Sequence, residues 1–196
     1  MTLFSAKPRL WSRSEYYRMA EMGFFENERV ELLRGEVVEM SPQDPLHAGA
    51  VENANNTLSS LFGTEFSVRV QLPLSAMKES EPEPDLLLLK SSDASSFRKN
   101  RTHPNTGQLV VEVARTSLNY DRFEKGSLYA QIDIQEYWII NLEDFVLEVF
   151  IEPGAAPDNP FGYSYGRKKT ITPGERYRFM NKDIPINMLF DGLLDS

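Results

Sequence analysis

The strongest constraint on the fold comes from two short, continuous apolar runs in the middle of the chain. Residues 86–89 are four consecutive leucines, and residues 109–114 read LVVEVA. Runs of this length without polar alternation are typical of strands that are covered on both faces. The sequence therefore predicts two buried strands, with other elements packed over the sheet that contains them.

Helical and strand-like patterns surround these two runs. We expect helices at residues 12–22, 45–63 and 119–132, the first because Ser12 and Glu15 have capping-box spacing. Further strands are expected at 29–33 and 36–40 as a hairpin, at 66–72, and at 136–142 and 145–151. Residues 91–107 look like a long polar loop, and residues 163–171 and 176–179 like a short hairpin. This order predicts an α/β or α+β fold in which helices flank a central mixed β-sheet.

Composition excludes several classes of function. The chain has no cysteine and two histidines, which rules out disulfides, thiolate chemistry and a three-histidine zinc site within one chain. A net charge of −8 in 196 residues argues against a general nucleic-acid coat protein. The N-terminal residues lack the apolar core of a secretory signal, and no stretch is long enough to span a membrane. We therefore expect a cytoplasmic protein without membrane contact.

Three acids occupy positions where a strand should be apolar. Glu31 lies within the first predicted strand, Asp85 opens the leucine run, and Glu112 interrupts the run at 109–114. A charged group in such a strand is costly to bury unless it is paired or binds a cation. Converging carboxylates favour Mg²⁺ or Mn²⁺. The alternative is that each acid faces solvent or pairs with a basic residue.

A lysine near these acids would complete a site for phosphodiester hydrolysis, because that reaction also needs stabilisation of developing negative charge. Lys125 is the candidate. It shares a helix face with Asp121 and Tyr129, which lie four residues to either side. The alternative for Lys125 and Asp121 is an ordinary surface pair.

These pieces occur in an order that resembles the PD-(D/E)XK nuclease superfamily, most closely its branch of restriction-endonuclease-like proteins of unknown cellular role. That branch has an ELxxGE hairpin, a helix led by histidine, a PD strand, an EV strand, a DxxxKxxxYA helix and an EYW strand. The matching pieces of this chain are Glu31–Glu36, His47, Pro84-Asp85, Glu112-Val113, Asp121 with Lys125 and Tyr129-Ala130, and Glu136–Trp138.

The resemblance implies a restriction-endonuclease-like fold, DNA as substrate, Mg²⁺ or Mn²⁺ as cofactor and a homodimer as an assembly. It implies that Asp85 and Glu112 bind the metal, together with the carbonyl of Val113. Lys125 would stabilise charge, and Glu31 would be an outer acid that holds a second metal or a water. The nuclease-like core would cover residues 12–150 of a single domain spanning 1–196, with 151–196 as an extension.

One departure concerns the lysine that the superfamily usually places two residues after the glutamate. This chain has Ala114 there, and the resemblance implies that Lys125 on the following helix replaces it. Arg115, Gly126 and Asp133 also differ from the expected residues, which affects helix geometry and substrate contacts but removes no catalytic group.

Residues outside this set are assigned to substrate binding. His47 either contacts Glu31 or a phosphate, or is a partly exposed residue at a helix start. Arg98, Lys99 and Arg101 belong to a basic loop that either grips phosphates or is simply solvated. We also place Asp121 among the substrate-binding residues.

Two functions remain open. The first is a metal-dependent endonuclease that hydrolyses DNA phosphodiester bonds. The second is a non-catalytic module that retains the nuclease fold and binds nucleic acid or a protein. A glycosidase is disfavoured, because nothing in the sequence indicates aromatic platforms for sugars.

Overall fold

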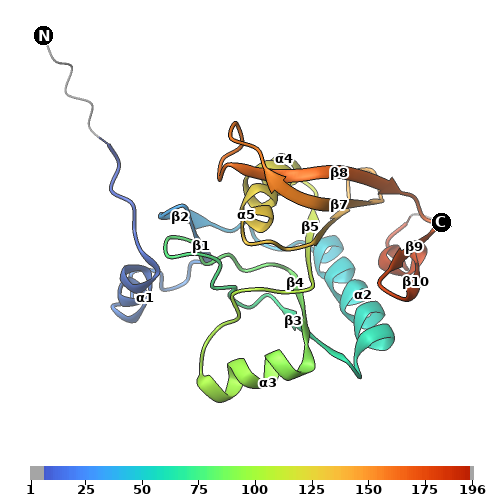
Figure 1. The fold of residues 1–196 in the computed structure, drawn as a ribbon, viewed down its shortest axis with the longest axis horizontal. Helices are drawn as coiled ribbons and strands as arrows, with labels where there is room; N and C mark the ends of the chain where they lie inside the picture. Colours follow the sequence, from blue (N-terminus) through green and yellow to red (C-terminus); the bar gives the residue numbers. More distant parts are fainter. Residues whose placement is uncertain (1–6, 195–196) are drawn as a thin grey trace, which may run out of the picture.

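The computed structural model describes residues 7–194, and a six-stranded mixed sheet forms its centre (Figure 1). Only β5 and β6 are parallel neighbours; the other pairs are antiparallel. In spatial order the strands are β3 (Phe66–Val70), β4 (Leu86–Lys90), β5 (Leu109–Ala114), β6 (Glu136–Asn141), β7 (Val146–Ala155) and β8 (Tyr163–Ile171). The predicted mixed sheet with flanking helices is confirmed.

The first two helices begin where the sequence places their N-caps. Ser12 and Glu15 form the complete capping box of α1 (Arg13–Glu21). Asp44 caps α2 (Pro45–Phe62), whose first residue is proline. The third predicted helix is made of three consecutive pieces: α4 (Leu118–Tyr120), a π-helical turn η1 (Asp121–Lys125) and α5 (Gly126–Gln131).

Each face of the sheet is covered by its own apolar core. On one face, α2 packs together with the hairpin of β9 (Arg176–Phe179) and β10 (Lys182–Pro185) and with the 3₁₀ turn η2 (Ile186–Phe190). On the other face, α4 and α5 cover the sheet, with Tyr129 and Tyr137 fully buried between them. This double cover explains why β4 and β5 are apolar at nearly every position.

Two local expectations were wrong. Residues 91–107 contain a ten-residue helix, α3 (Ser91–Asn100), although only Ala94 on it is buried. Its sequence lacks an apolar period, but Asp93 in its first turn and Arg98 and Lys99 in its last turn complement the helix dipole.

The C-terminal strands are paired differently from the prediction. β8 does not pair with β9; it extends the sheet by pairing with β7, and β9 pairs with β10. β7 runs from Val146 to Ala155, so the core boundary expected at residue 150 lies inside a strand. The division of the chain into a core and an extension stays a prediction.

The register between β4 and β5 creates the space for a site. Leu86, the first residue of β4, pairs with Val111. β5 continues for three more residues beyond that pair and is bonded to β6 alone. Asp85 therefore lies beside Glu112 and Val113, at the point where the two strands separate.

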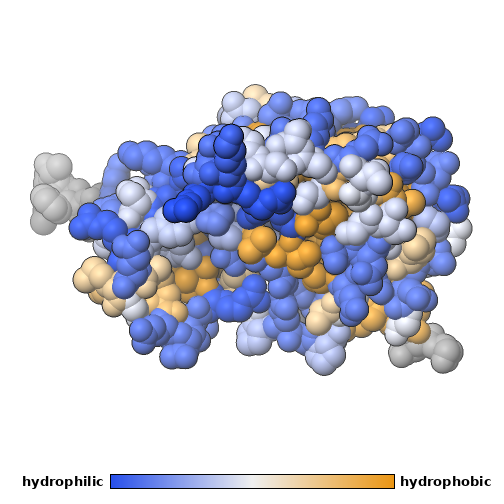
Figure 2. All heavy atoms as spheres, turned by 90° about the horizontal axis from the view of Figure 1, so that it is seen from below, coloured by the Kyte–Doolittle hydropathy of each residue, from blue (hydrophilic) through white to orange (hydrophobic). Residues whose placement is uncertain are grey.

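No helix in the described part of the chain is long and apolar enough to cross a membrane. Figure 2 shows one face of the molecule, on which hydrophilic residues surround apolar residues gathered in the middle.

The hairpin of β1 (Val30–Leu33) and β2 (Glu36–Glu39) depends on Gly35, so we predict that Gly35→Ala is destabilising. Gly35 has a φ of +77°, and an added Cβ would lie 2.6 Å from Cβ of Leu10 and 2.9 Å from the nitrogen of Trp11. Left-handed backbone and overpacking together should lower the free energy of unfolding by about 2–5 kcal/mol.

Gly174→Ala is the matched control, since Gly174 has a φ of +96° but an added Cβ would have no heavy atom within 4 Å. It should lower the free energy of unfolding by about 1–2 kcal/mol. Urea unfolding measures both values. Equal losses in the two variants would show that the close approach at Gly35 does not constrain the hairpin.

Candidate active site

Glu112 faces the helical layer from the middle of β5. Side chains alternate along a strand, so Glu112 shares its face with Val110 and Ala114, which belong to the core under α4 and α5. It is only 3% exposed. A carboxyl group at such a position must find partners within the protein.

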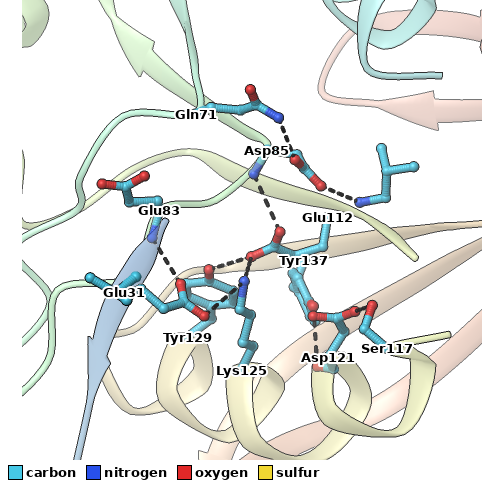
Figure 3. Close-up of polar contacts among 12 residues, drawn as sticks. Glu31, Gln71, Glu83, Asp85, Glu112, Ser117, Asp121, Lys125, Tyr129 and Tyr137 are labelled. Atoms are coloured by element: carbon cyan, nitrogen blue, oxygen red, sulfur yellow. Dashed lines mark hydrogen bonds and ion pairs between the residues drawn. The ribbon is translucent and has the colours of Figure 1, made fainter. Parts of the chain in front are cut away.

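The partners of Glu112 come from the segment that follows β5 and from the entrance to β4 (Figure 3). Lys125 Nζ lies 3.1 Å from Oε1 of Glu112, and the hydroxyl of Tyr129 donates to the same oxygen at 2.6 Å. The other oxygen, Oε2, accepts the main-chain N–H of Asp85 at 3.3 Å. These contacts hold both carboxylate oxygens of Glu112 in one orientation.

The π-helical turn η1 brings Asp121 and Lys125 into the interior together. Both side chains are buried, whereas Phe123 between them is exposed. π-Turns are rare and occur mostly as single turns inside α-helices, frequently at functional sites. The hydroxyl of Ser117 donates to Oδ2 of Asp121 at 2.6 Å and so holds that carboxyl.

Asp85 is held from several directions at the entrance to β4. Its Oδ1 accepts a hydrogen bond from Nε2 of Gln71 at 3.0 Å, and its Oδ2 accepts the N–H of Val113 at 2.8 Å. His47, from the first turn of α2, places Nε2 3.2 Å from Oδ2 of Asp85. This contact confirms neither role proposed for His47, but it places the histidine against a candidate metal ligand.

Glu31 connects the β1–β2 hairpin to the same group. Its Oε1 lies 3.4 Å from Nζ of Lys125, and its Oε2 accepts the main-chain N–H of Glu83 at 3.1 Å. Lys125 therefore bridges two acids from different strands. The hairpin and β5 therefore meet at one ammonium group, which the helical segment after β5 carries (Figure 3).

The pKa values of Glu112 and Asp85 are shifted in opposite directions, because burial dominates at Glu112 and hydrogen-bonding partners dominate at Asp85. Burial raises the pKa of Glu112 to about 8, although the charge of Lys125 opposes the shift. Burial also disfavours the charge on Asp85, but hydrogen bonds from His47 and Gln71 outweigh it, and the pKa of Asp85 lies below its usual range.

Lys125 keeps its charge despite its burial. Removal from water alone would lower the pKa of its ammonium group, but the charges of Glu112 and Glu31 outweigh that effect and hold the pKa well above its ordinary value. Burial raises the pKa of Asp121. The group therefore contains one permanent cation among acids of different strength, which is a common property of functional sites.

The carboxylates lie at the base of a cleft of about 350 Å³. Besides Lys125, the lining of the cleft includes the cationic side chains of Arg29 and Arg115. Further parts of the lining come from the hairpin, from the segment before α2 and from the turn after β5, among them Glu31, Met40, Asp44, His47, Asp85, Glu112, Val113, Ser117, Tyr120, Asp121 and Lys125.

The donor set in this cleft fits Mg²⁺ or Mn²⁺. Asp85, Glu112 and the main chain of Val113 offer hard oxygen atoms, and Mg²⁺ is usually held by one or two carboxylates plus substrate phosphates. Among residues 7–194 no three His, Asp or Glu side chains are arranged to hold a metal ion by themselves. Side chains of the described residues therefore do not complete the coordination of a metal ion in this cleft by themselves.

The structure brings together most residues that the sequence singles out. Those that line the cleft are Glu31, His47, Asp85, Glu112, Val113, Asp121 and Lys125. Arg98 and Lys99 lie instead in the last turn of α3, and Arg101 caps that helix; none of the three lines the cleft. The roles assigned to all of these residues stay predictions.

Two further residues hold the site and were not predicted. Tyr129 lies four residues after Lys125, a spacing that places both on one helix face, and this was the available signal. Gln71 follows β3 in a polar segment with a φ of +50°, which is uncommon for a side chain of its size. Nothing in the sequence around Gln71 indicates its contact with Asp85.

We predict that Tyr129→Phe destabilises the protein more than Tyr137→Phe. Both side chains are fully buried and donate one hydrogen bond, Tyr129 to the carboxyl of Glu112 and Tyr137 to the main-chain oxygen of Asp121. A bond to a charged group, as Glu112 is above its pKa of about 8, is worth about 1.5–3 kcal/mol, and a neutral bond is worth about 0.5–1.5 kcal/mol. Urea unfolding above pH 8 should show this order, and the reverse order would mean that Tyr129 does not fix Glu112.

Glu112 should also make stability depend on pH. Its pKa in the folded protein, about 8, lies above the ordinary value of 4.5. The folded state then binds more protons than the unfolded state between these values, so the contribution of Glu112 to stability is lost as pH rises from about 5 to 8.

Glu112→Gln removes this titration. We expect the free energy of unfolding of the natural protein to fall, relative to that of the Glu112→Gln variant, over this pH range. Parallel curves for the two proteins would show that the pKa of Glu112 is not raised.

Comparison with known proteins bears on the fold and on the family of the chain. The structure is similar to the crystal structure of a "putative nuclease belonging to DUF820" from Anabaena variabilis ATCC 29413, with a TM-score of 0.69 and 12% identity. The match covers 93% of this chain and 99% of the other, and at this identity it shows the fold alone.

A second solved structure, the type IIG restriction endonuclease BpuSI, matches with a TM-score of 0.37 and 15% identity over 58% of this chain and 13% of the other. A search of curated protein sequences finds no match. The sequence of residues 13–164 matches the model of the Uma2 family, described as "Putative restriction endonuclease". The chain belongs to the Uma2 family.

Proposed function

We propose that this protein is a metal-dependent endonuclease that hydrolyses phosphodiester bonds of DNA. The observation that carries the proposal is the contact of Lys125 with Glu112, beside Asp85, at the base of a cleft. Two acids and one permanent cation in this arrangement suit the transfer of a phosphoryl group, in which negative charge develops on oxygen.

The family match supports the class of reaction and the class of substrate. The matched model covers residues 13–164, which include every residue of the proposed site. Its description names a restriction endonuclease, and we infer from it that the substrate is DNA.

Asp85, Glu112 and the carbonyl of Val113 would hold Mg²⁺ or Mn²⁺. When bound, such an ion supplies a nucleophile at neutral pH and polarises the phosphoryl group. Glu112 must give up its proton for this role, since the ionised carboxylate is the ligand. Gln71 and the N–H of Val113 hold the carboxylate of Asp85 in a fixed orientation before any ion arrives.

Lys125 would stabilise the charge that develops on the phosphoryl oxygens. Its ammonium group is already in place, because Glu31 and Glu112 hold it, and burial shields it from water. A preorganised cation in a water-poor site acts strongly on a transition state. Glu31 would act as the outer acid, and His47 and Asp121 would face the substrate from the cleft wall.

Cleavage of supercoiled plasmid and of single-stranded DNA in the presence of Mg²⁺ or Mn²⁺ tests the proposal. We expect Asp85→Asn, Glu112→Gln and Lys125→Met each to lower the cleavage rate by about a hundredfold or more. Asp158→Asn and Lys78→Met change the same residue types at exposed positions and should cleave like the natural protein.

Cleavage that survives all three substitutions would disprove the assignment of the site. DNA binding that needs no metal and leads to no cleavage on any substrate would instead support the non-catalytic module. Melting temperatures of the variants, measured in parallel, separate loss of chemistry from loss of fold.

A further inference from the structure

The size of the cleft limits what can reach the proposed site. Asp85 and Glu112 lie at its base, and its volume of about 350 Å³ is near the lower end of the range of small-molecule sites, about 300–1,000 Å³. A space of this size accommodates one nucleotide of a strand. One nucleotide of a free strand fits such a space more readily than the backbone of a duplex, whose second strand takes up further room.

A second hollow continues from the first and offers that strand a path. Its volume is about 660 Å³, and both hollows are lined by Arg115 and Thr116 at the turn after β5. Its apolar lining consists of Leu46, Leu118, Leu142 and Phe145. The polar lining of the second hollow includes Arg122 and Glu143.

Phe145 presents an aromatic ring to this hollow from the turn between β6 and β7. The residue is partly buried, and its ring packs edge-to-face on Phe190 with centroids 6.0 Å apart. Its φ of +52° is a genuine outlier for a bulky side chain, and such backbone conformations cluster at functional sites. A ring supported on one side in this way is suited to stack against a nucleobase.

Two arginines line the same hollow as the ring. Among residues 7–194, the guanidinium of Arg115 forms an ion pair with Asp44 alone, at 3.4 Å, and both side chains are about half exposed, so the pair is weak and the guanidinium can bind a phosphate instead. The guanidinium of Arg122 donates a hydrogen bond to the carboxylate of Glu148, which also forms an ion pair with Lys168 at 2.7 Å, so two cations face that one acid. Glu143 also lines the hollow, and its negative charge opposes the positive charge of the arginines.

We propose that this second hollow binds an unpaired nucleotide next to the scissile phosphate, so that the substrate class is single-stranded DNA. The base stacks on Phe145, and Arg115, shared by both hollows, binds the backbone phosphate between them. This inference rests on the proposed function, which supplies DNA as the substrate, and it names the form of DNA that the site accepts.

Fluorescence anisotropy with a labelled oligonucleotide, single-stranded or annealed to its complement, tests the inference in buffer containing CaCl₂. The natural protein should bind the single strand at least tenfold more tightly than the duplex. Phe145→Leu keeps an apolar contact with Phe190 but removes the ring face, and should weaken single-strand binding about tenfold, the size of one stacking contact. Phe123→Leu is the control, because Phe123 is exposed and lines neither hollow.

Arg115→Gln gives a second, independent reading at an exposed position. It should weaken binding and reduce the slope of log affinity against log salt by about one, as expected for one lost phosphate contact. Arg167→Gln is its control, because Arg167 is similarly exposed, pairs with Glu152, and lines neither hollow.

Equal affinity for single strand and duplex would overturn the inference, as would unchanged single-strand binding by both Phe145→Leu and Arg115→Gln. These results are distinguishable from failure of the proposed function. Cleavage of duplex DNA that does not depend on Phe145 would leave the endonuclease intact and reject the second hollow. Single-strand binding that depends on Phe145, without any cleavage, would support the second hollow and reject the endonuclease.

Discussion

The burial of Lys125 among acids is the constraint on which the rest of the site depends. An ammonium group that is 6% exposed is stable only while Glu31 and Glu112 lie within reach, and loss of one partner of a buried pair costs about 3–5 kcal/mol. This requirement connects the β1–β2 hairpin, β5 and the π-helical turn. Asp85 joins through its main-chain N–H, which donates to Glu112.

The same arrangement would allow an acidic chain to act on the anionic substrate that we propose. Its net charge of −8 is partly concentrated in the cleft, where Glu31, Asp85, Glu112 and Asp121 face the single buried lysine. A divalent cation held there would invert the local sign. The arginines at the cleft and in the neighbouring hollow then lie where an entering strand would need them.

Much of the fold and the site follows from local patterns. Capping residues, the glycine of the hairpin and the apolar runs predict the elements, and Asp85, Glu112 and Lys125 stand out as charges within apolar surroundings. α3 was missed because its sequence is polar apart from Ala94 and Phe97. β8 pairs with β7, the strand before it, although the shorter connection to β9 favoured β9 as its partner. The contact of Gln71 with Asp85 was missed because it depends on a left-handed backbone at Gln71, which the local sequence does not indicate.

A crystal structure obtained with Mn²⁺ tests the central claim, that Asp85 and Glu112 form a metal site beside Lys125, most directly. Anomalous scattering locates the ion independently of any activity. We predict an ion within about 2.5 Å of a carboxylate oxygen of both Asp85 and Glu112, with Lys125 still in contact with Glu112. A crystal saturated with Mn²⁺ that shows no ion between these two carboxylates, or shows it bound elsewhere in the cleft, would contradict the claim.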